Sequence, residues 1–210
     1  MPGRRHFTPS CVRVRSIFAF RMTELEQYIK AGFGVNDRDM AAISSLFEPA
    51  LLKKGDYFLK AGRTCDKLSF VQSGLLRVYS IADGKEVTQW IATKGYFITD
   101  LSSLILGATS RWTIQALTDT ELHTIGKPAY DRIGEKVAQW PEMERRFIVQ
   151  CFALMENRIF CHLSMKAEER YEFFFNQHKE LFNQVPLQYI ASMLGMTPET
   201  FSRIRKKQLS

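Results

Sequence analysis

The stretch KGDYFLKAGRTCDKLSFVQSG, residues 54–74, decides the fold. Short runs of alternating apolar and polar residues are separated there by turns at Gly55, Gly62 and Gly74. Alternation with a period of two is typical of strands with one buried face, and closely spaced glycine turns favour an antiparallel sandwich or barrel. The pattern continues to residue 125, and Asp83-Gly84 between two apolar runs predicts a type I′ hairpin.

Helical patterns flank this predicted sheet on both sides. Residues 22–47 come before it, and Thr23 is placed to cap their first helix. After the sheet, Pro128 opens a short helix within residues 127–134, and Pro141 opens a long one. We therefore expect a first domain over 22–134, formed by the antiparallel sandwich or barrel and its flanking helices, and a long helix over 135–165. A small helical domain over 166–210 follows and begins with a helix over 166–182.

The long helix carries two adjacent apolar stripes. The first contains apolar or small residues at 147, 151, 154, 161 and 165, with Arg158 completing the four-three spacing, and the second contains Ile148, Phe152, Met155, Ile159 and His162. Two stripes need two partners, so we expect one to cover the sheet and the other to pair with a second copy. Arg158 favours a seam between subunits, where a long side chain can extend outward. A helix enclosed in one core is the alternative.

The last residues, VPLQYIASMLGMTPETFSRIRKKQLS (185–210), predict two short helices joined by a tight turn. Pro186 opens the first helix, and Gly195 supplies the positive φ that ends it. Thr197 caps the second helix, and Pro198 occupies its first turn. The apolar residues that would hold the two helices together are Ile190, Ala191, Leu194, Phe201 and Ile204.

The other face of the second predicted helix carries groups that can contact DNA. Arg203 can donate two parallel hydrogen bonds to a guanine, Glu199 can accept one from a cytosine amino group, and Ser202 can contact a base or a phosphate. The lysines and arginine that follow are expected on phosphates. The candidate DNA-binding residues are Thr197, Glu199, Thr200, Ser202, Arg203, Arg205, Lys206 and Lys207. The alternative is an ordinary helical hairpin whose basic end suits the helix dipole.

Composition excludes several classes of protein. The chain has 45% hydrophobic and 24% charged residues, and no apolar run approaches the roughly 20 residues that span a membrane, so we expect a cytoplasmic protein without a membrane partner. The four cysteines, at 11, 65, 151 and 161, lack metal-like spacing, and free thiols are expected. Because the sequence has no His-x-His pair, phosphate loop or nucleophile elbow, we expect no metal ligand, no catalytic residue and no enzymatic activity.

Much of the positive charge is concentrated at the start of the chain. Residues 1–21 contain five arginines and no acid, and without these arginines 24 basic residues face 22 acidic ones, which lowers the net charge from +7 to +2. We interpret residues 1–21 as a basic disordered extension and Met22 as the natural start. A basic DNA-contacting arm and a targeting peptide stay open as alternatives.

The order of β-roll, long helix and terminal helix pair resembles the Crp/Fnr family of bacterial transcription regulators, and its compact Bacteroidetes members in particular. The resemblance covers Met22 to Leu209, and it rests on residues 54–62, 68–74 and 199–203. It implies an α+β protein with an N-terminal antiparallel β-roll, or jelly-roll barrel, of the cyclic-nucleotide-binding type. It further implies a homodimer that binds a double-stranded DNA operator and has RNA polymerase as a partner.

The resemblance also places a ligand pocket in the roll, where the sequence departs from the family pattern. Cyclic-nucleotide binders of the family carry Gly-Glu before a short helix, whereas this chain has Thr99 and Asp100; Arg111 comes one place late, which would turn its side chain to the other face of the strand. A gap in the preceding loop would restore the register. A cyclic nucleotide, another small ligand and no ligand all stay open, and no cofactor is certain. The candidate pocket residues are Thr99, Asp100, Leu101, Ser110, Arg111, Trp112 and Thr113.

Family members normally follow the recognition helix with a β-hairpin wing, whereas few residues follow Lys207 here. We expect a helix-turn-helix that lacks a full wing by nature, with a shortened chain as the alternative. Dimerisation would then matter more for affinity. Two other functions stay open. One is a ligand-binding sensor module whose terminal helices dock on a protein partner. The other is a haem or iron–sulfur redox sensor of the same family, although among its cysteines only Cys11 lies near the N-terminus.

Overall fold

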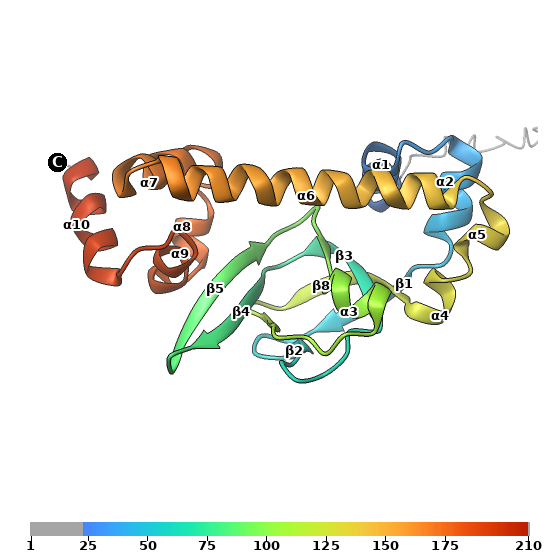
Figure 1. Cartoon of the computed structure of the whole chain (residues 1–210), viewed down its shortest axis with the longest axis horizontal. Coiled ribbons are helices and arrows are strands. Elements are labelled where there is room, and N and C mark those ends of the chain that lie inside the picture. The colour runs from blue at the N-terminus through green and yellow to red at the C-terminus, as the bar shows by residue number, and fades with distance from the viewer. Residues whose placement is uncertain (1–22, 210) are drawn as a thin grey trace, which may run out of the picture.

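The computed structural model describes residues 23–209. A long helix, α6 (Trp140–Ser164), runs along a β-roll, with small helices at both of its ends (Figure 1). The expected basic extension over residues 1–21 lies outside the described residues. No helix among residues 23–209 is long and apolar enough to cross a membrane.

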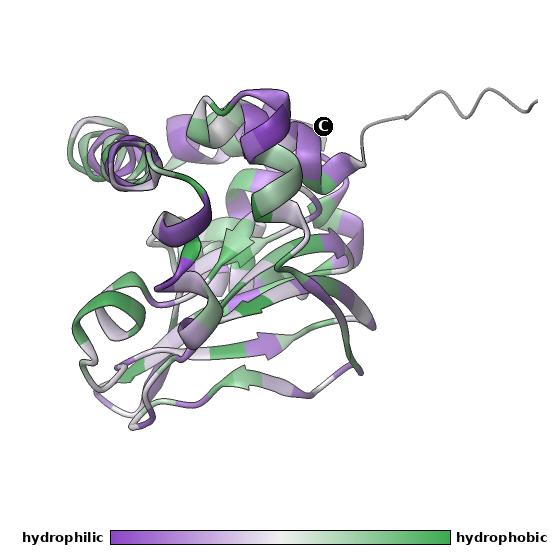
Figure 2. Cartoon of the chain, turned by 90° about the vertical axis from the view of Figure 1, so that its right-hand side faces the viewer, coloured by the Kyte–Doolittle hydropathy of each residue, from purple (hydrophilic) through white to green (hydrophobic). Residues whose placement is uncertain are grey.

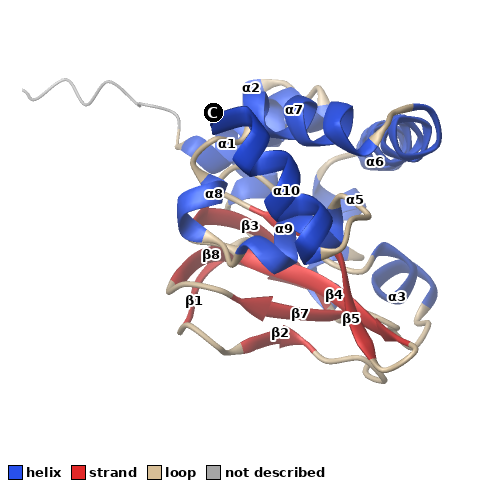
Figure 3. Cartoon of the chain, turned by 90° about the vertical axis from the view of Figure 1, so that its left-hand side faces the viewer, coloured by secondary structure: helices blue, strands red, loops and turns tan. Residues whose placement is uncertain are grey.

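Two four-stranded antiparallel sheets form the roll, in the orders β1-β8-β3-β6 and β2-β7-β4-β5 (Figure 3). The strands are β1 (Glu48–Leu52), β2 (Tyr57–Leu59), β3 (Lys67–Ser73), β4 (Leu76–Ala82), β5 (Lys85–Ala92), β6 (Phe97–Ile98), β7 (Thr113–Ala116) and β8 (Thr120–Gly126). The predicted α+β class is therefore confirmed: an antiparallel β-roll followed by helices.

Strand β3 is buried on both faces. Val71 packs into the core between the two sheets, whereas Phe70 belongs to a second core under the helices, and both are 0% exposed. That second core also contains Ile29 from α1 (Glu24–Phe33) and Trp140 from α6. Because consecutive side chains of a strand point to opposite faces, β3 joins the sheets to the helices that cover them.

The predicted local signals of the roll are confirmed. Thr23 and Glu26 form the capping box of α1. The β4–β5 hairpin turns at Asp83 and Gly84, with φ of 50° and 72°, as a type I′ turn requires. Gly74 has a φ of 91°, and its Cα faces the backbone of the β7–β8 turn so closely that a side chain there would meet Asp119 and Thr120.

The remaining helices are α2 (Asp37–Ser44), α3 (Leu101–Leu106), α4 (Lys127–Tyr130), α5 (Ile133–Lys136), α7 (Ala167–Gln177), α8 (Leu181–Gln184), α9 (Leu187–Met193) and α10 (Pro198–Leu209). One predicted helix boundary was wrong and another is confirmed. The long helix begins at Trp140, with Pro141 in its first turn as predicted, and α5 and a turn occupy the start of the segment 135–165. The helix expected over 166–182 ends at Gln177, because His178 leaves helical geometry at a φ of −138°.

Candidate nucleic-acid interface

Helices α9 and α10 pack together around a turn at Gly195. This glycine has a φ of 67°, and its N–H donates to the carbonyl of Ser192 over 3.0 Å. The Thr197 hydroxyl accepts from the N–H of Thr200 over 3.2 Å, so the predicted cap is present. The apolar residues predicted to hold the pair together are all buried, at 6% exposure or less: Ile190, Ala191, Leu194, Phe201 and Ile204.

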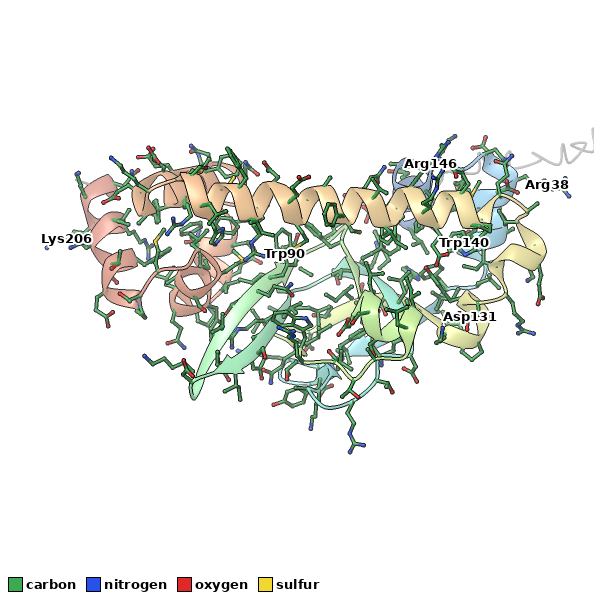
Figure 4. All side chains as sticks on the ribbon, viewed as in Figure 1. Arg38, Trp90, Asp131, Trp140, Arg146 and Lys206 are labelled. Atoms are coloured by element: carbon green, nitrogen blue, oxygen red, sulfur yellow. The ribbon has the colours of Figure 1, made fainter. Side chains whose placement is uncertain are left out.

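The outer face of α10 carries most of the predicted DNA-binding residues. Exposed are Thr197, Glu199, Ser202, Arg203, Lys206 and Lys207, whereas Thr200 is half-buried. Lys206 projects away from the molecule at the end opposite α1 (Figure 4). Arg205 departs from the expected outward direction: it is half-buried, and its positive charge acts on Tyr171 of α7.

Glu199 lies in the first turn of α10 and stays ionised. A backbone N–H bond and the hydroxyl of Thr197 hold the pKa of its carboxyl below the usual range. A carboxylate near a helix N-terminus is also favoured by the helix dipole. The outer face therefore presents one fixed acceptor, Glu199, one turn before the donor Arg203.

The terminal helices are docked on the roll of the same chain. Helix α9 lies against β5, where the backbone N–H of Thr88 donates to the hydroxyl of Ser192 over 2.9 Å. The guanidinium of Arg77 lies 3.6 Å from the ring centroid of Tyr189 and pairs with Glu86 over 2.6 Å, although Arg77 is only 2% exposed. A cleft of about 760 Å³ separates the start of α10 from the β4–β5 hairpin.

Apolar side chains complete this docking. Leu75, which precedes β4, and Ile91 of β5 belong to the same buried cluster as Tyr171, Ile190 and Phe201 of the terminal helices. The cluster therefore crosses from the roll to the helix pair without a solvated boundary.

Helix α6 contacts the roll with one side and leaves the other uncovered. Seen almost end-on in Figure 2, it lies at the edge of the molecule and carries hydrophobic as well as hydrophilic residues. Val149, Phe152, Ile159 and Leu163 of its outer face are between 56% and 82% exposed. They repeat at intervals of three, seven and four residues, which is the spacing of a helix-pairing seam when Glu156 fills the gap.

The interpretation of Arg158, a residue of the first stripe, as part of a seam between subunits was wrong. Its guanidinium points inward, where Nη2 donates to the carbonyl of Met193 over 3.1 Å and the group lies 5.4 Å from the ring centroid of Trp90. Trp90 projects from β5 towards α6 (Figure 4). The residues that bind α6 to the roll and to α9 are thus partly polar, which an apolar stripe does not reveal.

The roll contains a cavity of about 430 Å³ beneath α6, called here the roll cavity. Of the seven predicted pocket residues, the structure brings Thr99, Asp100, Leu101 and Trp112 to its wall and leaves Ser110, Arg111 and Thr113 outside. The sequence reasoning missed its aromatic and helical walls, which include Trp90, Tyr96, Phe147 and Met155. Phe147 and Met155 belong to the two stripes of the long helix, whereas no local signal marks Tyr96.

The chemistry of the roll cavity differs from that expected for a phosphate site. Asp100 is the only charged residue among those that line it, and its carboxylate accepts the N–H groups of Ser102 and Ser103 at the start of α3. Arg111 is exposed, with its guanidinium 6.0 Å from the ring centroid of Trp112. Among the described residues, no cationic side chain therefore lines this cavity. The N–H groups at the start of α3 already donate to the carboxylate of Asp100.

Among residues 23–209, no group of three His, Cys, Asp or Glu side chains is arranged to hold a metal ion. Cys65, Cys151 and Cys161 are free thiols, and burial raises the pKa of the Cys151 thiol at the wall of the roll cavity. Cys11 lies outside the described residues.

Comparison with known proteins defines the class of the roll. Residues 50–136 match the family model of the cyclic nucleotide-binding domain. This segment extends from β1 to α5 and contains the entire wall that the roll contributes to the cavity. No curated protein matches the chain in sequence.

Solved structures extend the likeness beyond the roll. The chain matches the catabolite activator protein of Thermus thermophilus at 20% identity over 86% of this chain and 85% of that one, with a TM-score of 0.54. It matches the c-di-GMP responsive global regulator CLP of Xanthomonas campestris at 14% identity over 83% and 92%, with a TM-score of 0.61. At these identities the likeness shows the fold alone, a fold shared with regulators of Crp/Fnr type.

The chain spans less than half the length of other matched structures. It covers 43% of the regulatory domain of Toxoplasma gondii PKA with cAMP, at 19% identity over 52% of this chain and a TM-score of 0.48. No conclusion rests on that likeness.

Proposed function

We propose that the chain is a sequence-specific DNA-binding transcriptional regulator of Crp/Fnr type, active as a homodimer, whose roll senses a small ligand. One observation carries the proposal. The capped helix α10 buries Phe201 and Ile204 and presents Glu199, Ser202 and Arg203 together on its exposed face. An acceptor, a hydroxyl and a planar donor on one helix face are the groups that read base edges in a major groove.

The basic end of α10 supports the same proposal. Lys206 and Lys207 follow Arg203 by about one turn and are exposed, so they can contact phosphates while the start of the helix reads bases. A double-stranded operator is then the partner of this face, and RNA polymerase is a further partner by family resemblance.

The outer face of α6 supports the homodimer. A soluble monomer rarely leaves Val149, Phe152, Ile159 and Leu163 exposed in one line, and pairing with the same helix of a second copy would cover them. Paired α6 helices would bring two α10 helices together on one duplex, about 34 Å apart, as two half-sites of a palindrome require.

Binding to DNA at two salt concentrations tests the proposal. Duplexes selected from a random library by the purified protein should share a palindromic sequence. Affinity for them should fall steeply from about 50 to 200 mM salt, because bound phosphates release counterions. Arg203→Ala should weaken binding to the selected sequence and relax the preference at one position of each half-site. The matched control is Arg145→Ala, since Arg145 is an exposed arginine of α6 that pairs with Glu142. Weak, salt-independent binding would contradict the proposal.

A further inference from the structure

A second cavity lies where α6, α7 and α9 meet, outside the roll. It measures about 210 Å³, and we call it the joint cavity. Trp90 and Tyr96 separate it from the roll cavity, since both side chains line both spaces. The joint cavity is lined by side chains of the long helix and of the terminal helices, so an occupant would touch both.

Arg158 is the residue that gives the joint cavity its chemistry. Its Nη1 atom is buried and has no hydrogen-bond partner within residues 23–209. No carboxylate of that part of the chain pairs with the guanidinium, and burial alone lowers the pKa of this group. A buried cation with an unused donor is costly unless a partner completes it. The guanidinium of Arg158 therefore has no ion-pair partner within residues 23–209.

Some of the other donors of the guanidinium and of its neighbour hold backbone carbonyls. Nη2 of Arg158 holds the carbonyl of Met193, while Arg170 donates to the carbonyls of Leu194 and Met165 over 2.9 and 2.7 Å. Nδ1 of His162 lies 3.0 Å from the carbonyl of Arg158. Nη1 of Arg158 is the buried nitrogen at this centre that lacks a partner, and the side chains of Asn157, Gln177 and His178 add further polar groups to the lining.

The walls of the joint cavity determine which charge and polarity an occupant can have. None of the residues that line it is acidic, so nothing repels an anion there. Phe174, Leu154, Met165 and the ring of Trp90 form apolar walls around the guanidinium. A carboxylate on an apolar body would satisfy both the guanidinium and these walls, whereas a small inorganic anion would leave the apolar walls without a partner.

We propose that the joint cavity binds a small organic carboxylate, which pairs with the guanidinium of Arg158 and whose apolar body packs against Trp90 and Phe174. The site is separate from the roll cavity and does not depend on DNA binding. Because the same guanidinium holds the carbonyl of Met193 at the end of α9, an occupant would act on the contact between the long helix and the DNA-reading pair.

Ligand binding to the full chain, without DNA, tests this site. Phenylacetate is the probe, its uncharged amide phenylacetamide is the matched compound, and inorganic phosphate is the multiply charged one. Titrations would follow Trp fluorescence and the melting temperature. Phenylacetate should raise the melting temperature and bind at least tenfold more tightly than the amide, and phosphate should have no comparable effect. This comparison uses the unaltered protein and needs no folded variant.

Variants locate the binding. Arg158→Gln should abolish the response to phenylacetate, whereas Arg111→Gln should keep it, because Arg111 also lies over a tryptophan but lines neither cavity. Equal binding by Arg158→Gln, equal affinity for the amide or for phosphate, or no binding of any probe would each overturn the proposal. If Arg158→Gln instead abolished dimers while no probe bound, the missing carboxylate would belong to a second copy, and the ligand site would be rejected.

Discussion

Arginine side chains show how far surroundings decide what a residue does. Arg203 is exposed on α10, Arg111 is exposed above Trp112, and Arg77 is buried between Glu86 and Tyr189. Arg158 has a buried nitrogen without a partner. Helical spacing alone predicted that Arg203 is exposed, because α10 is a regular helix with one buried face. It misjudged Arg158, because the partners of that side chain lie in β5 and α9, far away in the chain.

At the residue scale, Arg203→Ala should weaken binding to the selected operator by about 1–3 kcal/mol and relax specificity at one position of each half-site, since an arginine on a guanine reads a base edge. Lys206→Ala should instead weaken binding to all sequences alike and reduce the salt dependence. Competition titrations against operators with single base changes measure both. A uniform loss for Arg203→Ala would make it a phosphate contact.

Gly74→Ala should destabilise the roll. A Cβ there would lie 2.5 Å from the Asp119 carbonyl oxygen and 2.7 Å from Cα of Thr120, and the φ of 91° is strained for alanine. We expect the free energy of unfolding to fall by about 1–3 kcal/mol from overpacking, in addition to the backbone cost. Gly84→Ala is the control, because it has a similar positive φ but nothing within 4 Å. Urea unfolding compares them, and equal losses would exclude the steric contribution.

At the scale of elements, local signals predicted well wherever one element decides the outcome. The cap of α1, the Asp83-Gly84 turn and the buried face of α10 depend on neighbours in sequence. The helix boundary at His178 was missed because the contacts around it join separate elements, with Phe182 of α8 packed against Tyr171 and Phe175 of α7. The joint cavity was beyond prediction for the same reason, since three separate elements form it.

The link between α4 and α6 gives a pH-dependent prediction. Burial, followed by the hydrogen bond that the Tyr130 hydroxyl donates to Glu144 over 2.5 Å, raises the pKa of this phenol. Because the folded pKa lies above the unfolded one, the stability from protonated Tyr130 is full below about pH 10 and is lost as pH rises further. Tyr130→Phe should cost about 1 kcal/mol below pH 10 and progressively less above it.

Urea unfolding of both proteins from pH 7 to 11 measures this difference, and the comparison cancels the other tyrosines. A difference that stays constant across that range would show that Tyr130 ionises equally in the folded and unfolded states.

At the scale of the whole molecule, the outer face of α6 predicts the oligomeric state. Phe152→Asp together with Ile159→Asp should convert the proposed dimer to a monomer, because charges at the seam would be buried without partners. Affinity for a palindromic operator should drop towards that for a single half-site. Leu106→Asp is the control, since Leu106 is 78% exposed but lies in α3. Light scattering after gel filtration decides, and a double variant that stays dimeric would place the interface elsewhere.

The buried cluster that contains Leu75 and Ile91 limits how the roll and the terminal helices can evolve, because both parts contribute to it. A substitution at Leu75 or Ile91 of the roll also changes the interior of the helix pair. The two parts therefore cannot be exchanged freely with those of a relative by joining the chains near residue 165. A functional chimera would have to carry Leu75, Ile91 and their partners from one parent. The hydrophobic interior would therefore couple the evolution of the proposed ligand preference to that of the proposed operator preference.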